Sequence, residues 1–177
     1  MTLAFLLAAA SLPFFVDPVI PAGLGPIDPQ PGSWVEYLVR TRGREDVRVR
    51  VTVLPAQGEG GYWLELTAAG GSGIASAARV LIAGDRPWPA NVGRMCAMVA
   101  GQQPVEIPLD RIRLALPRTT ARVPMRVWRA KGVPLWGLVK ARSRRQSVEL
   151  LASGTSGGHS VFPSGCDQGN GSESAKK

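Results

Sequence analysis

The chain has little of the material from which most catalytic and metal sites are built. Its 177 residues include one histidine, two cysteines, and thirteen acidic residues against twenty-one lysines and arginines. The two cysteines, Cys96 and Cys166, form no Cys-x-x-Cys motif and have no histidine close by, so a zinc site is not supported. Neither an acidic calcium loop nor a glycine-rich phosphate loop ending in Gly-Lys-Ser/Thr is present. We therefore expect no metal and no cofactor.

A catalytic serine has equally little support. The run Gly154-Thr155-Ser156-Gly157-Gly158 has the form of the G-x-S-x-G motif of serine hydrolases, which requires a strand before the serine and a helix after it. The residues that follow are poor helix formers. The only histidine, His159, lies three residues further on, whereas hydrolases bring their base from a distant loop. We interpret the match as chance and predict that the protein is not an enzyme.

The apolar N-terminal run is too short to cross a bilayer, which takes about 20 residues. It extends from Leu3 to Val16 and is typical of the apolar core of a secretory signal, although no Lys or Arg precedes it. A buried first helix is the alternative. We expect residues 1–16 to be a signal-like segment and the protein to be exported to the periplasm or cell envelope. Cys96 and Cys166 could pair in such an oxidising compartment, and the sequence leaves this open.

Glycine and proline, by contrast, are abundant, with 21 and 15 residues, which is typical of many turns. Proline recurs through residues 17–32 and predicts an extended spacer there. Residues 33–163 have the composition of one β-rich domain. Residues 164–177 are mostly glycine, serine, asparagine and charged residues, so we expect a disordered tail.

Alternation of apolar and polar residues predicts strands. It is clearest where valines at 47, 49, 51 and 53 alternate with Arg48, Arg50 and Thr52. Further strands are expected over residues 33–40, 62–67, 77–83, 109–116, 123–129, 135–141 and 147–152. Val92, Met95, Cys96 and Val99 have helical spacing and predict one short helix over residues 91–99. The fold class is therefore mainly β (α+β): a curved antiparallel sheet or half-barrel with one short covering helix.

Several short motifs occur in a fixed order along this domain. They are Gly32 to Tyr37, Trp63 with Glu65, Val127-Trp128, Val133 to Lys140, and Glu149-Leu150 ahead of Gly154. Over residues 32–160 this order resembles a group of uncharacterised exported bacterial envelope proteins. Their outline is similar to that of the periplasmic Lol-type lipoprotein carriers, which are half-open antiparallel β-barrels covered by helices. The resemblance implies a curved sheet that could hold a lipid.

Positive charge is concentrated in one part of the chain. Eleven lysines and arginines and no acidic residue lie between Arg111 and Arg145, while the rest of the chain is mildly acidic. Such a field attracts phosphates, anionic lipid head groups or acidic proteins. The alternative is a solvated sheet face. The candidates for binding anionic groups are Arg111, Arg113, Arg126, Arg129, Lys131 and Lys140.

Aromatic side chains supply the candidates for an apolar ligand. The chain has five tryptophans, each with a large apolar area and one N–H donor. They could fill the core, or some could line a cavity under a curved sheet. The candidates for ligand binding are Trp34, Tyr37, Trp63, Trp128 and Trp136.

Three functional hypotheses follow. The first is a non-enzymatic envelope binding protein that holds an apolar or lipid-like ligand on a curved β-sheet. The second is a structural or interaction module of the envelope that presents a basic, arginine-rich face to an anionic membrane surface or an acidic protein. The third, a nucleic-acid binder, is disfavoured by the export signal, so we expect no nucleic-acid partner.

Overall fold

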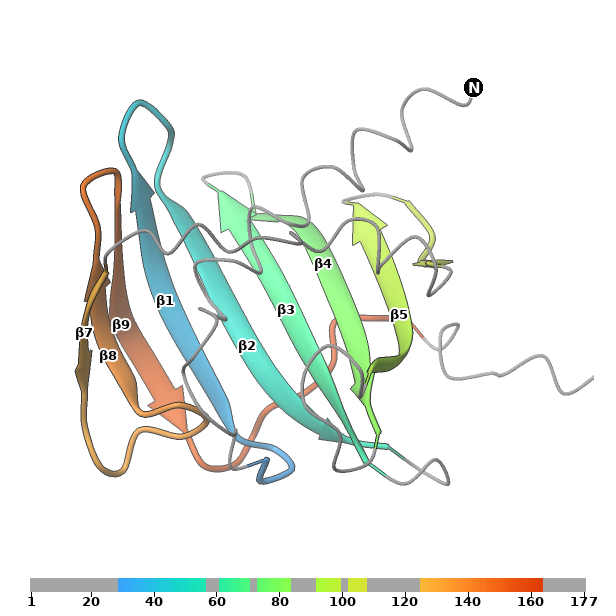
Figure 1. Ribbon diagram of the computed structural model, residues 1–177. Helices are drawn as coiled ribbons and strands as arrows, with labels where there is room; N and C mark the ends of the chain where they lie inside the picture. The colour runs from blue at the N-terminus through green and yellow to red at the C-terminus, as the bar shows by residue number, and fades with distance from the viewer. Residues whose placement is uncertain are drawn as a thin grey trace, which may run out of the picture.

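The computed structural model describes residues 29–56, 61–70, 73–83, 92–99, 102–107 and 125–163. Within these ranges the chain forms a single curved, unclosed antiparallel sheet of nine strands and no helix (Figure 1). The predicted mainly β fold with a curved antiparallel sheet is therefore confirmed. The strands are β1 Trp34–Thr41, β2 Val47–Pro55, β3 Tyr62–Gly70, β4 Gly73–Ile82, β5 Val92–Val99, β6 Val105–Glu106, β7 Arg126–Arg129, β8 Leu138–Arg142 and β9 Gln146–Gly154.

The sheet has an almost sequential topology. Its strand order is β6-β5-β4-β3-β2-β1-β9-β8-β7, so every hydrogen-bonded pair but one joins consecutive strands. The exception is β1 with β9, which are paired antiparallel from Trp34 opposite Gly154 to Thr41 opposite Gln146. This pairing places the last strand beside the first and makes β1 an interior strand.

One face of the sheet carries the main hydrophobic core. The alternating residues of β1 and β2 are buried there, including Val35, Tyr37, Val49 and Val51. Leu64 and Leu66 of β3 and Val148 of β9 belong to the same cluster. The period-two pattern therefore identified the buried face of these strands correctly, because alternate side chains of a strand point to opposite faces.

The helix predicted over residues 91–99 is wrong, since Val92–Val99 is strand β5, paired with β4. Met95 joins the main core on one face, whereas Cys96 packs with Ala77 and Phe162 in a separate cluster. A strand that buries apolar side chains on both faces loses its period-two pattern. The helical spacing of its apolar residues was therefore a coincidence.

The hairpin connecting β7 and β8 differs from the expected strand limits. Strand β8 begins at Leu138 rather than at Leu135, because Leu135 and Gly137 have positive φ angles of 66° and 69° and turn the chain. A Cβ atom at Gly137 would lie 3.1 Å from the Ala130 carbonyl oxygen, so glycine suits this bend. The strand predicted over 123–129 is described only from residue 126.

Other predictions fall outside the described residues. These are the strand over 109–116, the signal-like segment 1–16, residues 17–28 of the spacer and the tail 164–177. The last residues of the spacer are described. There the Gly32 amide donates a hydrogen bond to the Val53 carbonyl at 2.8 Å and so continues the β1–β2 pairing beyond Trp34.

The segment after β9 crosses the face opposite the main core, and we call residues 155–163 the strap. Strand register places Trp34, Thr52, Glu65, Arg79 and Cys96 in one lateral row on that face. The strap follows this row from β9 towards β5 (Figure 1). Its contacts are hydrogen bonds from the Trp34 indole to the Ser156 carbonyl (3.1 Å), from the Gly158 amide to the Gly32 carbonyl (2.8 Å), and from the Ser160 hydroxyl and Val161 amide to the Glu65 carboxylate (2.5 and 2.8 Å).

Cys96 is fully buried beneath the end of the strap and is disulfide-bonded. The chain has one other cysteine, Cys166, which lies outside the described residues. A disulfide at this position stabilises the folded state chiefly by limiting the freedom of the unfolded chain.

Candidate anion-binding site

Two hairpin turns meet at one end of the sheet. The first connects β1 to β2 through residues 42–46, and the second connects β8 to β9 through residues 143–145. They lie side by side at the upper left of Figure 1 because β1 pairs with β9. The Arg42 amide donates a hydrogen bond to the Arg145 carbonyl at 2.9 Å and joins the two turns directly.

The second turn is held by Ser143. Its hydroxyl oxygen accepts hydrogen bonds from the amides of Arg145 (3.3 Å) and Gln146 (3.1 Å), and the Ser143 amide donates to the Gln146 carbonyl at 2.8 Å. Serine commonly closes such turns in this way. The turn therefore holds the backbone of Arg144 and Arg145 in one place while leaving their side chains in solvent.

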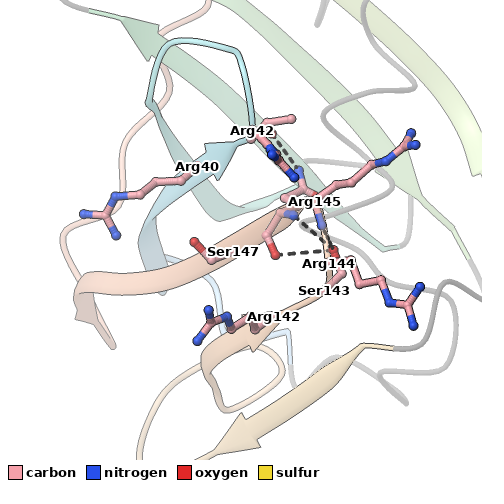
Figure 2. A pocket seen from close by; sticks show the side chains of 9 residues that line it. Arg40, Arg42, Arg142, Ser143, Arg144, Arg145 and Ser147 are labelled. Carbon is pink, nitrogen blue, oxygen red and sulfur yellow. Dashed lines mark hydrogen bonds between the residues drawn. The ribbon is translucent and has the colours of Figure 1, made fainter.

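A hollow of about 260 Å³ lies between the two turns and is open to solvent. Figure 2 shows the arginine side chains around it pointing in different directions, as repulsion between like charges favours. We call it the arginine hollow. Its lining consists of Arg40, Thr41, Arg42, Arg142, Ser143, Arg144, Arg145, Gln146 and Ser147.

The strand register extends the positive charge across the same end of the sheet. Arg126 of β7 lies opposite Arg142 of β8, Arg142 lies opposite Ser147 of β9, and Ser147 lies opposite Arg40 of β1. Residues opposite one another in antiparallel strands share a face. Three arginines therefore stand in one lateral row, although like charges placed opposite each other destabilise a sheet.

Part of this charge is neutralised within the protein. Glu149 accepts hydrogen bonds from Lys140 at 2.6 Å and from Arg40 at 2.8 Å, and Arg40 also bonds Asp46 at 3.1 Å. The hydrogen bond from Lys140, followed by that from Arg40, lowers the pKa of Glu149 below its ordinary value of 4.5. These pairs are open to solvent on at least one side, so each contributes little to stability.

Four arginines of the hollow are not neutralised in this way. Arg42, Arg142, Arg144 and Arg145 are exposed and form no ion pair with any acidic group in the described ranges. Glu45 lies in the first turn but does not line the hollow. The hollow therefore offers several guanidinium groups to an anion from solution.

The basic candidates from the sequence do not form one face. Arg126 lies at the hollow end of the β7–β8 hairpin, whereas Arg129 and Lys131 are exposed at its other end. Lys140 is occupied by Glu149. Arg111 and Arg113 lie outside the described residues. Residues that are close in the sequence were therefore predicted to act together, but they lie at opposite ends of the β7–β8 hairpin.

The aromatic candidates are also distributed over both faces. Tyr37 and Trp136 belong to the main core, where the Tyr37 hydroxyl donates to the Leu138 carbonyl at 3.2 Å. On the opposite face Trp63 packs with Leu54 and Leu81, and the Trp34 ring lies 4.0 Å from the Arg50 guanidinium carbon. Trp128, on strand β7, is 44% exposed. The structure therefore places Tyr37 and Trp136 in the main core and Trp34 and Trp63 on the opposite face, and ligand binding by these residues stays a prediction.

Sequence reasoning missed the residues of the arginine hollow. Arg142, Arg144 and Arg145 lie within the basic stretch, and their position just before a predicted strand is the signal that could have identified them. Arg42 had no such signal, because its approach to Arg145 depends on the β1–β9 pairing.

We also searched the described residues for other classes of site. These residues contain no group of three or more His, Cys, Asp or Glu side chains that could hold a metal ion. They also contain no helix long and apolar enough to span a membrane. Residues 155–163 form no helix after Ser156, and the His159 imidazole lies 3.3 Å from the Gly157 carbonyl oxygen.

Comparison with known proteins adds no family to this description. No family model matches the chain, and no curated protein or solved structure matches it. The resemblance to exported envelope proteins with a Lol-type outline consequently stays a prediction.

Proposed function

We propose that the protein is a non-enzymatic binding protein of the cell envelope that engages an anionic partner through the hairpin end of its sheet. The observation that carries this proposal is the set of exposed arginines around the arginine hollow, continued by Arg126 on β7. Guanidinium groups suit anionic partners because they remain charged and present several donors in a fixed plane.

Export is part of this proposal and rests on two observations. The N-terminal apolar run has the character of a secretory signal. Cys96 is disulfide-bonded, and disulfides persist chiefly in oxidising compartments such as the periplasm. Fractionation of cells that express the full chain should recover it from the envelope or periplasm, and recovery from the cytoplasm alone would contradict export.

The binding proposal is tested with two anionic probes, polyglutamate and vesicles that contain phosphatidylglycerol. We expect binding to both to weaken as salt rises, because exposed charges are screened. The variant R126E/R144E should bind at least tenfold more weakly. The matched variant R129E/K131E reverses the same number of charges at the other end of the β7–β8 hairpin and should retain most of the affinity.

Thermal unfolding of both variants provides the stability control. All four side chains are exposed, so their melting temperatures should stay close to that of the wild type. Failure of the wild type to bind either probe at low salt, or equal binding by R126E/R144E, would remove the proposal.

A second candidate function is binding of an apolar or lipid-like ligand on the core face of the sheet. It is favoured by the curvature of the unclosed sheet. Native mass spectrometry of protein purified from the envelope should then find a co-purified lipid, which W136A should lose and W128A should keep. A protein that carries no lipid would count against this function.

A further inference from the structure

The lining of the arginine hollow decides which class of ligand suits it. The hollow has a volume of about 260 Å³ and is open to solvent. An apolar ligand would find little to contact there, since the lining is arginine, serine, threonine and glutamine. The lining therefore fits a small anion or the anionic end of a larger molecule.

The donors around the hollow favour a phosphate group over a single carboxylate. Arg42 and Arg145 are adjacent through their backbone hydrogen bond, and Arg142 lies in the same lining. Ser147, the register partner of Arg142, adds a hydroxyl. A phosphate ester presents several acceptor oxygens, and arginine pairs with them in a two-bonded geometry. A carboxylate has two oxygens and would leave most of these donors unused.

We propose that the arginine hollow is a phosphate-binding site in which the side chains of Arg42, Arg142 and Arg145, which point in different directions in the structure (Figure 2), turn towards one another to hold the phosphate of a phosphate ester. This inference rests on the proposed function and names the chemistry of its ligand. A phosphate bound at Arg142 also offsets part of the repulsion between Arg142 and Arg126, which the strand pairing places opposite it.

The test is titration of the full chain with inorganic phosphate, followed by the backbone amide resonances. We expect saturable shifts at Arg42 and at residues 143–147, and a rise in melting temperature with phosphate concentration because phosphate binds the folded state. R142Q/R145Q should weaken binding by about tenfold or more, since each lost guanidinium removes charge-assisted hydrogen bonds.

The variant R142K/R145K tests whether phosphate binding requires the geometry of the arginine side chains or only their positive charge. It keeps the net charge but loses the planar, two-bonded geometry, so phosphate binding should fall while polyglutamate binding stays. Unchanged phosphate binding by R142K/R145K, or shifts centred on Arg129 and Lys131, would overturn the inference and leave the proposed function intact. A wild type that binds neither polyglutamate nor phosphatidylglycerol vesicles would instead remove the proposed function.

Two further probes distinguish the sources of the phosphate. Glycerol 3-phosphate represents a soluble ester, and vesicles of phosphatidylcholine with phosphatidic acid represent a lipid head group. Binding to either that depends on Arg142 and Arg145 supports the site, and the tighter of the two identifies its source. Binding to neither would overturn the inference.

Discussion

Tyr37 and Tyr62 are the two tyrosines of the chain, and burial raises the pKa of both phenols above the ordinary value near 10. Tyr37 is fully buried in the main core, where its hydroxyl donates to the Leu138 carbonyl. The neutral phenol therefore joins β1 to the start of β8, and its ionisation would leave a charge without water in the core.

Alkaline titration tests this placement. A raised pKa means that the folded protein keeps protons which the unfolded chain loses near pH 10, so stability should fall as the pH rises above that value. Tyr37 should ionise only together with unfolding, so near pH 10 the folded protein should absorb less at the tyrosinate band than protein in denaturant, which should titrate near pH 10. A native protein whose two tyrosines both ionise near pH 10 would contradict the burial.

Gly154 allows the Trp34 ring to lie directly against the backbone of β9. A Cβ atom at this position would be 2.6 Å from the Trp34 indole nitrogen. The indole would have to move and lose its hydrogen bond to the Ser156 carbonyl. We expect G154A to destabilise the protein by about 1–3 kcal/mol. G70A, whose Cβ would meet nothing within 4 Å, is the control for chemical denaturation and should change stability by less than about 0.5 kcal/mol.

At the scale of elements, the strap depends on one buried carboxylate. Glu65 is 1% exposed in β3, and its two oxygens accept hydrogen bonds from the Ser160 hydroxyl and the Val161 amide. Trp34 and Phe162 hold the strap on either side of this point. The pairing of β3 with its neighbours fixes the position of Glu65 on the sheet. The strap is bonded to Glu65, so it must cross the sheet at this point.

We expect E65Q to release the middle of the strap. The amide retains one acceptor oxygen and leaves one strap donor without a partner, which costs about 1–3 kcal/mol. Hydrogen exchange should become faster at Val161 and Phe162 and stay unchanged in β2. E36Q, on the same face but without a hydrogen bond to the strap, serves as control. Equal exchange in E65Q and the wild type would show that the strap is held by its other contacts.

The local pattern of the sequence predicted strands well where one face is buried and the other is not. That condition holds for β1 and for residues 47–51 of β2, where burial alternates in step with the valines and polar residues. It fails for β5, which buries Met95 and Cys96 on opposite faces. Strand β6 has only two residues, Val105–Glu106, and is too short to show a period.

At the scale of the whole molecule, the sequence could not predict which distant strands pair. The β1–β9 pairing joins residues more than 100 positions apart, such as Trp34 and Gly154, and nothing in the local pattern specifies it. The arginine hollow depends on this pairing. The sequence could therefore identify only those lining residues that lie within the basic stretch.

The disulfide of Cys96 should matter most for the molecule as a whole. If it closes a loop to Cys166, simple loop-closure estimates give about 4 kcal/mol of stabilisation for a loop of roughly 70 residues. Reduction should then lower the melting temperature without altering strand content, as measured by circular dichroism. An unchanged melting temperature on reduction would contradict this, and C166S provides the comparison without reductant while keeping the buried Cys96 side chain.

Because β9 lies beside β1, the same sheet could be formed by a chain whose strands are connected in a different order. Joining the end of β9 to the start of β1 by a tight turn, and opening the chain between β6 and β7, gives a circular permutant that runs β7-β8-β9-β1 through to β6. Every strand would then pair with its successor, and the mean sequence separation of contacts would drop, which favours faster folding. The new turn would interrupt the strap, so such a permutant gains speed while losing the covering of Glu65 and Cys96.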